Sequence, residues 1–135
     1  MVVIEAKDYG GIKVTLTDSG IRTIFLSRIK RNHSWTIKIF EDITNIINDA
    51  AIDGDRTKLV YITGGSRKIF SSGNDVLNYF PKDETERELI LGSSINTIEK
   101  FFSSFISFPK ISMYNIVYKK ISQYIFVYKN KTFTI

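Results

Sequence analysis

An amphipathic helix between strand-forming segments constrains the fold of this chain more than any other feature. Apolar side chains recur at three- and four-residue spacing over residues 36–52, the period of a helix with one buried face. Residues 12–26 hold two short strand patterns on either side of the turn Asp18-Ser19-Gly20, which predicts a β-hairpin. Asp53-Gly54-Asp55 ends the helix, and residues 58–63 predict a third strand. Strands joined through a helix predict the α/β class.

A second helix is predicted over residues 84–106, where acidic residues precede an apolar stripe. Pro109 stops this helix, and Gly92-Ser93-Ser94 is a point at which it can kink. The stripe consists of Leu89, Ile90, Ile95, Ile98, Phe101, Phe102 and Phe105.

The last 25 residues differ in composition from the rest of the chain. The 135 residues suffice for one domain, and the absence of cysteine excludes disulfides. The net charge is +1 over residues 1–110 and +4 over residues 111–135. Because the excess charge is confined to the end, it does not favour nucleic-acid binding. High β propensity allows short strands in 111–135, but its basic, aromatic composition predicts a tail foreign to the fold of 1–110.

No segment has the pattern of a targeting or membrane sequence. The first residues contain acids and lack the apolar core of a signal peptide, and the final Thr132-Phe133-Thr134-Ile135 is not a peroxisomal address. Lys119, Lys120 and Gln123 interrupt the apolar residues of the tail, so we expect no transmembrane helix and no membrane partner.

A glycine-containing segment follows the third predicted strand and is the strongest candidate for a functional site. Thr63-Gly64-Gly65-Ser66 is turn-forming, and Phe70-Ser71-Ser72-Gly73-Asn74-Asp75 leads into a helix predicted to begin at about Val76. This arrangement places backbone N–H groups at a helix N-terminus. Such a site can hold an anion, or an oxygen that becomes anionic during a reaction.

Four motifs in order resemble the crotonase (enoyl-CoA hydratase/isomerase) superfamily, most closely the peroxisomal-type Δ3,Δ2-enoyl-CoA isomerases. They are Leu26-Ser27-Arg28-Ile29-Lys30-Arg31-Asn32, Thr63-Gly64, Phe70-Ser71-Ser72-Gly73-Asn74-Asp75 and Phe105-Ile106-Ser107-Phe108-Pro109-Lys110. The resemblance covers residues 1–110 and implies an incomplete crotonase-type spiral of β-β-α units, followed by a C-terminal tail unlike the family.

The resemblance also implies a binding site for the CoA thioester of an acyl chain. The thioester oxygen would accept a hydrogen bond from the backbone N–H of Asn74, the first of two oxyanion-hole donors. Gly73 would allow close approach of the backbone, and Asp75 would cap the following helix. The substrate-binding residues so implied are Ser71, Ser72, Gly73, Asn74 and Asp75, together with Lys30 and Arg31 beside the CoA phosphates. A solvated basic loop is the alternative for Lys30 and Arg31.

The implied reaction is the isomerisation of a 3-enoyl-CoA to a 2-enoyl-CoA in fatty acid β-oxidation, with no metal and no cofactor apart from the CoA of the substrate. The family's second oxyanion donor and its catalytic carboxylate follow the Phe-Pro-Lys motif, and no Asp or Glu follows Glu99 here. Glu84, Glu86 and Glu88 suit a solvated helix start, and His33 is interpreted as a loop histidine. We therefore expect a truncated, weakly active or inactive chain.

Two kinds of function remain open at this stage. The first is an enoyl-CoA isomerase-related protein, and the alternative is a non-enzymatic acyl-CoA binder or a partner of full-length trimeric relatives. We expect exposed apolar faces to make the chain self-associate. The resemblance implies a peroxisomal or mitochondrial location, while the lack of a visible signal leaves the cytoplasm open.

Overall fold

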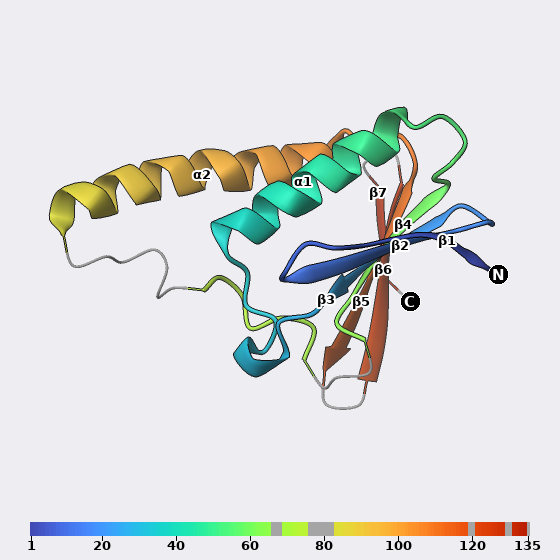
Figure 1. Cartoon of the computed structure of the whole chain (residues 1–135), viewed down its shortest axis with the longest axis horizontal. Coiled ribbons are helices and arrows are strands. Elements are labelled where there is room, and N and C mark those ends of the chain that lie inside the picture. The colour runs from blue at the N-terminus through green and yellow to red at the C-terminus, as the bar shows by residue number, and fades with distance from the viewer. Residues whose placement is uncertain (66–68, 76–82, 119–120, 129–130, 135) are drawn as a thin grey trace.

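A computed structural model describes residues 1–65, 69–75, 83–118, 121–128 and 131–134, with the backbone alone for residue 111 and for those beyond 112. Within these ranges the chain forms one seven-stranded sheet with helices packed against it, as Figure 1 shows. The predicted α/β class is therefore confirmed. No helix of the described ranges is long and apolar enough to cross a membrane.

The bounds of the elements follow the chain in order. The strands are β1 (Val3–Asp8), β2 (Ile12–Thr17), β3 (Ile21–Leu26), β4 (Leu59–Thr63), β5 (Ile111–Tyr118), β6 (Ile121–Tyr128) and β7 (Lys131–Thr134). The helices are the short 3-10 helix η1 (Ile29–Arg31), α1 (Ile37–Ile52) and α2 (Glu84–Ile106).

The strands lie in the sheet in the order in which they occur in the sequence. β1, β2 and β3 pair antiparallel, and α1 then carries the chain back so that β4 pairs parallel with β3. α2 does the same between β4 and β5, and the two helices lie side by side (Figure 1). Because β3 and β4 are parallel, the loops that follow them leave the same end of the sheet.

The predicted hairpin and first helix are confirmed. Ile12, Val14 and Leu16 of β2 are buried, as the alternation predicts. Thr36 caps α1 by accepting a hydrogen bond from the backbone N–H of Ile39. Gly20, in the turn between β2 and β3, has φ +87°, and an added Cβ would come within 2.9 Å of the Lys58 side chain.

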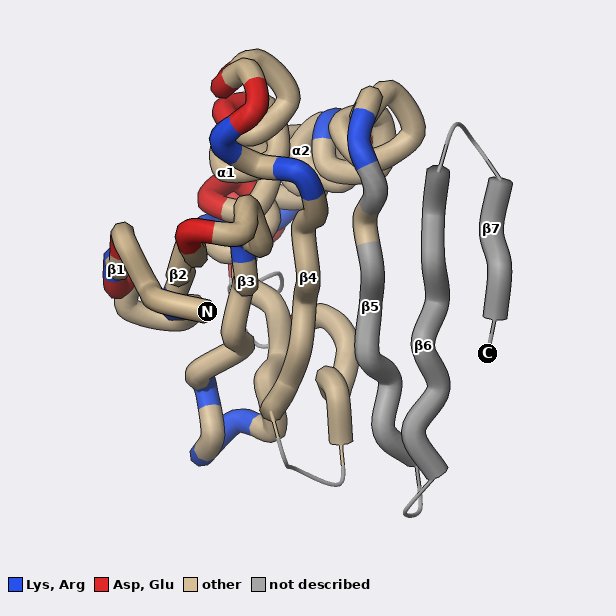
Figure 2. The backbone as a smooth tube through the Cα atoms, turned by 90° about the vertical axis from the view of Figure 1, so that its right-hand side faces the viewer, with Lys and Arg blue, Asp and Glu red and all other residues tan. Residues whose placement is uncertain are grey.

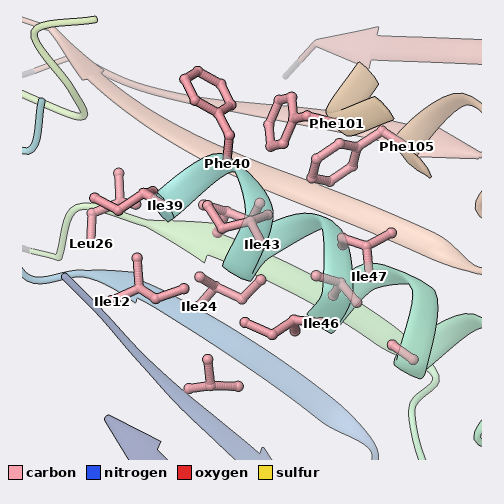
Figure 3. Packing of buried hydrophobic residues seen from close by; sticks show 14 of the residues in the cluster. Ile12, Ile24, Leu26, Ile39, Phe40, Ile43, Ile46, Ile47, Phe101 and Phe105 are labelled. Atoms are coloured by element: carbon pink, nitrogen blue, oxygen red, sulfur yellow. The ribbon is translucent and has the colours of Figure 1, made fainter. Parts of the chain in front are cut away.

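The hydrophobic core lies between the sheet and the two helices. Figure 3 shows Ile43, Ile46 and Ile47 of α1 in one cluster with Ile12 and Ile24 of the strands. Beside them a cluster of aromatic rings joins the helices to the segment before α1. Ring centroids of Phe101 lie 5.3 Å from Trp35, 5.0 Å from Phe40 and 4.9 Å from Phe105.

The stripe predicted for α2 is only partly buried. The helix has the predicted bounds and runs through Gly92 without a break, and Phe101 and Phe105 are buried. Leu89, Ile95 and Phe102, which belong to the same apolar stripe, are 75%, 62% and 57% exposed. α1 covers one side of α2, and the predicted stripe was wider than that side. The expected self-association stays a prediction, and these side chains are the apolar surface that it requires.

The tail continues the sheet. β5 pairs in register with β4, from Leu59 opposite Ile111 to Thr63 opposite Asn115, and β6 and β7 follow antiparallel. The short strands that its β propensity allowed are therefore present. The division of the chain into residues 1–110 and 111–135 rests on composition, and stays a prediction.

Candidate functional site

Two loops meet at the end of the sheet where β3 and β4 finish. We call residues 27–35 the basic loop and residues 69–75 the glycine loop. Figure 2 shows lysine and arginine gathered on the basic loop at one end of the sheet, while the charges around the end of α1 lie at the other. The parallel pairing of β3 with β4 brings together two loops that are about 40 residues apart in the sequence.

Hydrogen bonds tie the first part of the glycine loop to the basic loop. The Ser71 hydroxyl donates to the His33 carbonyl (2.7 Å), and the Ser72 N–H donates to the Asn32 carbonyl (3.0 Å). Asn32 and His33 have φ of 48° and 55°, so both adopt the left-handed region that turns the basic loop. His33 lies in the loop as expected, but it is only 3% exposed, which the sequence pattern did not indicate.

A short parallel bridge fixes the second part of the glycine loop. The Trp35 N–H donates to the Gly73 carbonyl (2.9 Å), and the Asp75 N–H donates to the Trp35 carbonyl (2.8 Å). In such a bridge the residue between the two bonded groups, here Asn74, directs its own N–H and C=O away from the partner strand. No acceptor for the Asn74 N–H lies among the described residues, and Asn74 is exposed.

The neighbouring N–H groups differ from that of Asn74. Ser72 and Asp75 donate to backbone carbonyls, and the Gly73 N–H donates to the Ser71 hydroxyl (3.0 Å). Gly73 has φ +87°, while no described atom lies within 4 Å of an added Cβ. Glycine is therefore required by the backbone angle and not by crowding from protein atoms. Within residues 72–75, Asn74 thus has the one N–H group that is available to a ligand, and the N–H groups on either side of it have acceptors.

The carboxylate of Asp75 is paired with the basic loop. Arg28 Nη2 donates to Asp75 Oδ2 at 2.8 Å, and the two side chains are 21% and 10% exposed. Residues 76–82, which include the predicted start of a helix at Val76, lie outside the described residues. The predicted capping role of Asp75 stays a prediction, whereas its ion pair with Arg28 is a finding.

Lys30 and Arg31 lie on η1, where both are exposed. The segment from Ser27 to Arg31 lines an open cavity of about 390 Å³. Both cations are therefore accessible to an anionic ligand at the same end of the sheet as Asn74, and their assignment to CoA phosphates stays a prediction.

The fold matches those of solved enoyl-CoA hydratases. An enoyl-CoA hydratase from Mycobacterium avium subsp. paratuberculosis is 21% identical, with a TM-score of 0.64 over 81% of this chain and 37% of that one. An enoyl-CoA hydratase from Bacillus anthracis is 19% identical, with a TM-score of 0.65 over 77% of this chain and 38% of that one. An enoyl-CoA hydratase/carnithine racemase from Magnetospirillum magneticum is 16% identical, with a TM-score of 0.68 over 82% and 40%.

At these identities the likeness shows the fold alone, and it confirms the partial crotonase-type fold expected from the resemblance. The chain spans about 40% of the length of the structures that it matches. No protein-family profile and no curated protein matches the sequence.

Arg28 belongs to one of the four motifs, but no role was predicted for it from the sequence. A usable signal was present, because Arg28 follows β3 and Asp75 lies in the loop after the neighbouring parallel strand. Opposite charges in loops that leave the same end of a sheet are candidates for an ion pair. The pairing of β3 with β4 had to be known before that signal could be used.

Proposed function

We propose that this chain is an acyl-CoA-binding protein of the crotonase type, related to the Δ3,Δ2-enoyl-CoA isomerases, with weak or no isomerase activity. The observation that carries the proposal is the direction of the Asn74 N–H, which points away from the bridge to Trp35. The N–H groups on either side of it, those of Gly73 and Asp75, have acceptors. A thioester carbonyl oxygen is the acceptor that suits this donor on such a fold.

The chemistry of the glycine loop supports binding and polarisation better than turnover. Isomerisation of a 3-enoyl-CoA to a 2-enoyl-CoA needs a base to move a proton and donors to stabilise the enolate. The one carboxylate between residues 71 and 75 is Asp75, and Arg28 already binds it. Loss of a single oxyanion donor lowers kcat by about 10²–10³-fold in well-studied enzymes.

The first test uses an aryl-enoyl-CoA, whose absorption moves to longer wavelength when its carbonyl is polarised. We expect a red shift with the wild-type chain and with Asn74→Ala, which keeps the N–H group. Asn74→Pro removes that N–H and is expected to abolish the shift. Circular dichroism and the unfolding midpoint confirm that the proline variant is folded. An equal shift with Asn74→Pro would exclude the assigned donor.

An isomerase assay on a 3-enoyl-CoA completes this test. We expect conversion no faster than in the absence of protein, because residues 72–75 offer one donor, the Asn74 N–H, and no unpaired carboxylate. Enzyme-dependent conversion that disappears in Asn74→Pro would show that the chain is an active isomerase and would overturn the proposed lack of turnover.

A second prediction concerns salt. CoA phosphates are proposed to pair with Lys30 and Arg31, and exposed ion pairs are screened over about 8–10 Å near physiological salt. CoA affinity should therefore fall as salt rises, and Lys30→Ala/Arg31→Ala should remove most of this dependence. The matched control is Lys13→Ala/Lys38→Ala, which removes two exposed positive charges from β2 and α1. Titration calorimetry at several salt concentrations measures the CoA affinity of each double variant. Equal effects of the two double variants would exclude the basic loop as the phosphate site.

A further inference from the structure

We propose that Arg28 is a positioning residue, which fixes the direction of the Asn74 N–H by holding the glycine loop against the basic loop. The inference rests on the proposed function, because it concerns the same donor. Its evidence is separate, since it comes from side-chain contacts rather than from the backbone bridge.

The guanidinium of Arg28 binds both loops at once. Its Nη1 donates to the Ser34 carbonyl (2.7 Å) and to the Ser34 hydroxyl (3.1 Å), and its Nη2 donates to Asp75 Oδ2 (2.8 Å). The Ser34 hydroxyl also lies 3.4 Å from the same carboxylate oxygen. One planar group therefore joins three acceptors from two segments that are 41 residues apart.

These contacts lie next to the groups that orient Asn74. Ser34 directly precedes Trp35, and Asp75 directly follows Asn74. The bridge itself consists of two backbone hydrogen bonds, and Gly73 beside it has no side chain to restrict its backbone. A bridge of this length is marginal alone. The hydrogen bonds of Ser71 and Ser72 hold the start of the glycine loop, and the Arg28 contacts add a constraint at its end, beside Asn74.

Burial makes the contacts of Arg28 strong. Asp75 and Ser34 are 8% and 7% exposed, and charge-assisted hydrogen bonds are stronger away from water. Lysine cannot replace Arg28, because a single ammonium group lacks the planar fork that spans Ser34 and Asp75. Arg28→Lys therefore keeps the charge of the basic loop and removes the geometry.

The first arm of the experiment needs no ligand. Hydrogen exchange of the Asp75 amide, which donates to the Trp35 carbonyl, reports whether the bridge is held closed. We expect Arg28→Lys to speed this exchange at least about tenfold, with no change in the amides that pair β2 with β3. Arg56→Lys is the matched control, because Arg56 pairs with Glu5 at an exposed site and lies before β4, whereas the glycine loop follows that strand. Unchanged exchange in Arg28→Lys would overturn the proposal.

The second arm measures the absorption of the aryl-enoyl-CoA bound at saturation, at a temperature well below the unfolding midpoint of each variant. We expect Arg28→Lys to keep the dissociation constant within about threefold, because the charge is retained, and to lose at least about half of the red shift. A purely structural role would lower the midpoint and leave the saturated shift unchanged, which would overturn the positioning role. If the wild-type chain gives no shift while Asp75 exchange still accelerates in Arg28→Lys, the proposed function fails and the role of Arg28 in holding the loops stands.

Discussion

Replacing Phe101 with alanine is expected to lower the free energy of unfolding by about 3–5 kcal/mol. Phe101 is 6% exposed and is the ring that contacts Trp35, Phe40 and Phe105 together. Its loss removes buried apolar area and leaves a cavity between α1 and α2. Because the free energy of unfolding of a small domain is about 5–15 kcal/mol, this single change removes a large part of the stability.

Phe102→Ala is the matched control, since it removes the same atoms from the next position of the helix. Phe102 is 57% exposed, and the described rings place only Phe101 against it, at 5.4 Å. We expect this variant to lose less than about 1 kcal/mol. Urea unfolding of both variants gives the comparison. Equal losses would mean that the aromatic cluster does not hold α2 in place.

The second large effect is expected at Asp53, which ends α1. Oδ1 of Asp53 accepts from Lys110 Nζ (2.6 Å), and Oδ2 accepts from Arg22 (3.2 Å) and from the Thr57 hydroxyl (2.5 Å). Lys110 Nζ also donates to the carbonyls of Ala50 and Gly54. These groups join the end of α1 to β3 and to the start of β5.

Partial burial by itself would raise the pKa of Asp53, but the hydrogen bonds from Lys110 and Thr57 outweigh it and lower the pKa from 3.8 to about 2. The pKa is thus lower in the folded chain than in the unfolded one. The resulting stabilisation, about 2 kcal/mol, is fully present above pH about 4 and is lost as the pH falls through about 2.

Asp53→Asn should therefore lose at least about 2 kcal/mol at neutral pH, and the difference from the wild type should shrink below pH about 4. Asp49→Asn, at an exposed position of α1, is the control and should change stability by less than about 0.5 kcal/mol. Denaturant unfolding across the acid range measures the difference. A loss that is as large at pH about 2 as at neutral pH would show that the charge of Asp53 is not its source.

Elements with one buried face were predictable from the sequence. Side chains are buried at alternate positions in the hairpin 12–26 and β4, and at helical spacing in α1 and α2. The spacing of apolar residues in the sequence therefore predicts the type of each element. β1 was not predicted, because every residue of Val3–Asp8 is exposed and no face of the strand is selected for burial. The stripe of α2 was predicted from the same period, but the period alone does not give which of its apolar side chains the described elements bury.

The position of the candidate site was predictable from its motif, whereas the hydrogen bonds and ion pairs that hold it together were not. The segment from Ser71 to Asp75 was singled out by its turn-forming residues, and the structure joins it to the basic loop. The pair between Arg28 and Asp75 spans 47 residues and the pair between Asp53 and Lys110 spans 57. Contacts of such separation depend on the strand order, and local periodicity contains no information on that order.

The contact of Lys110 also sets an order of events during synthesis. Translation adds about 5–20 residues each second, so the 57 residues from Asp53 to Lys110 take about 3–11 s. Throughout that interval α1 can form and dock on the hairpin, but its last turn has no lysine to bind the Ala50 and Gly54 carbonyls. The nascent chain therefore closes the end of α1 only after the whole of α2 has been made.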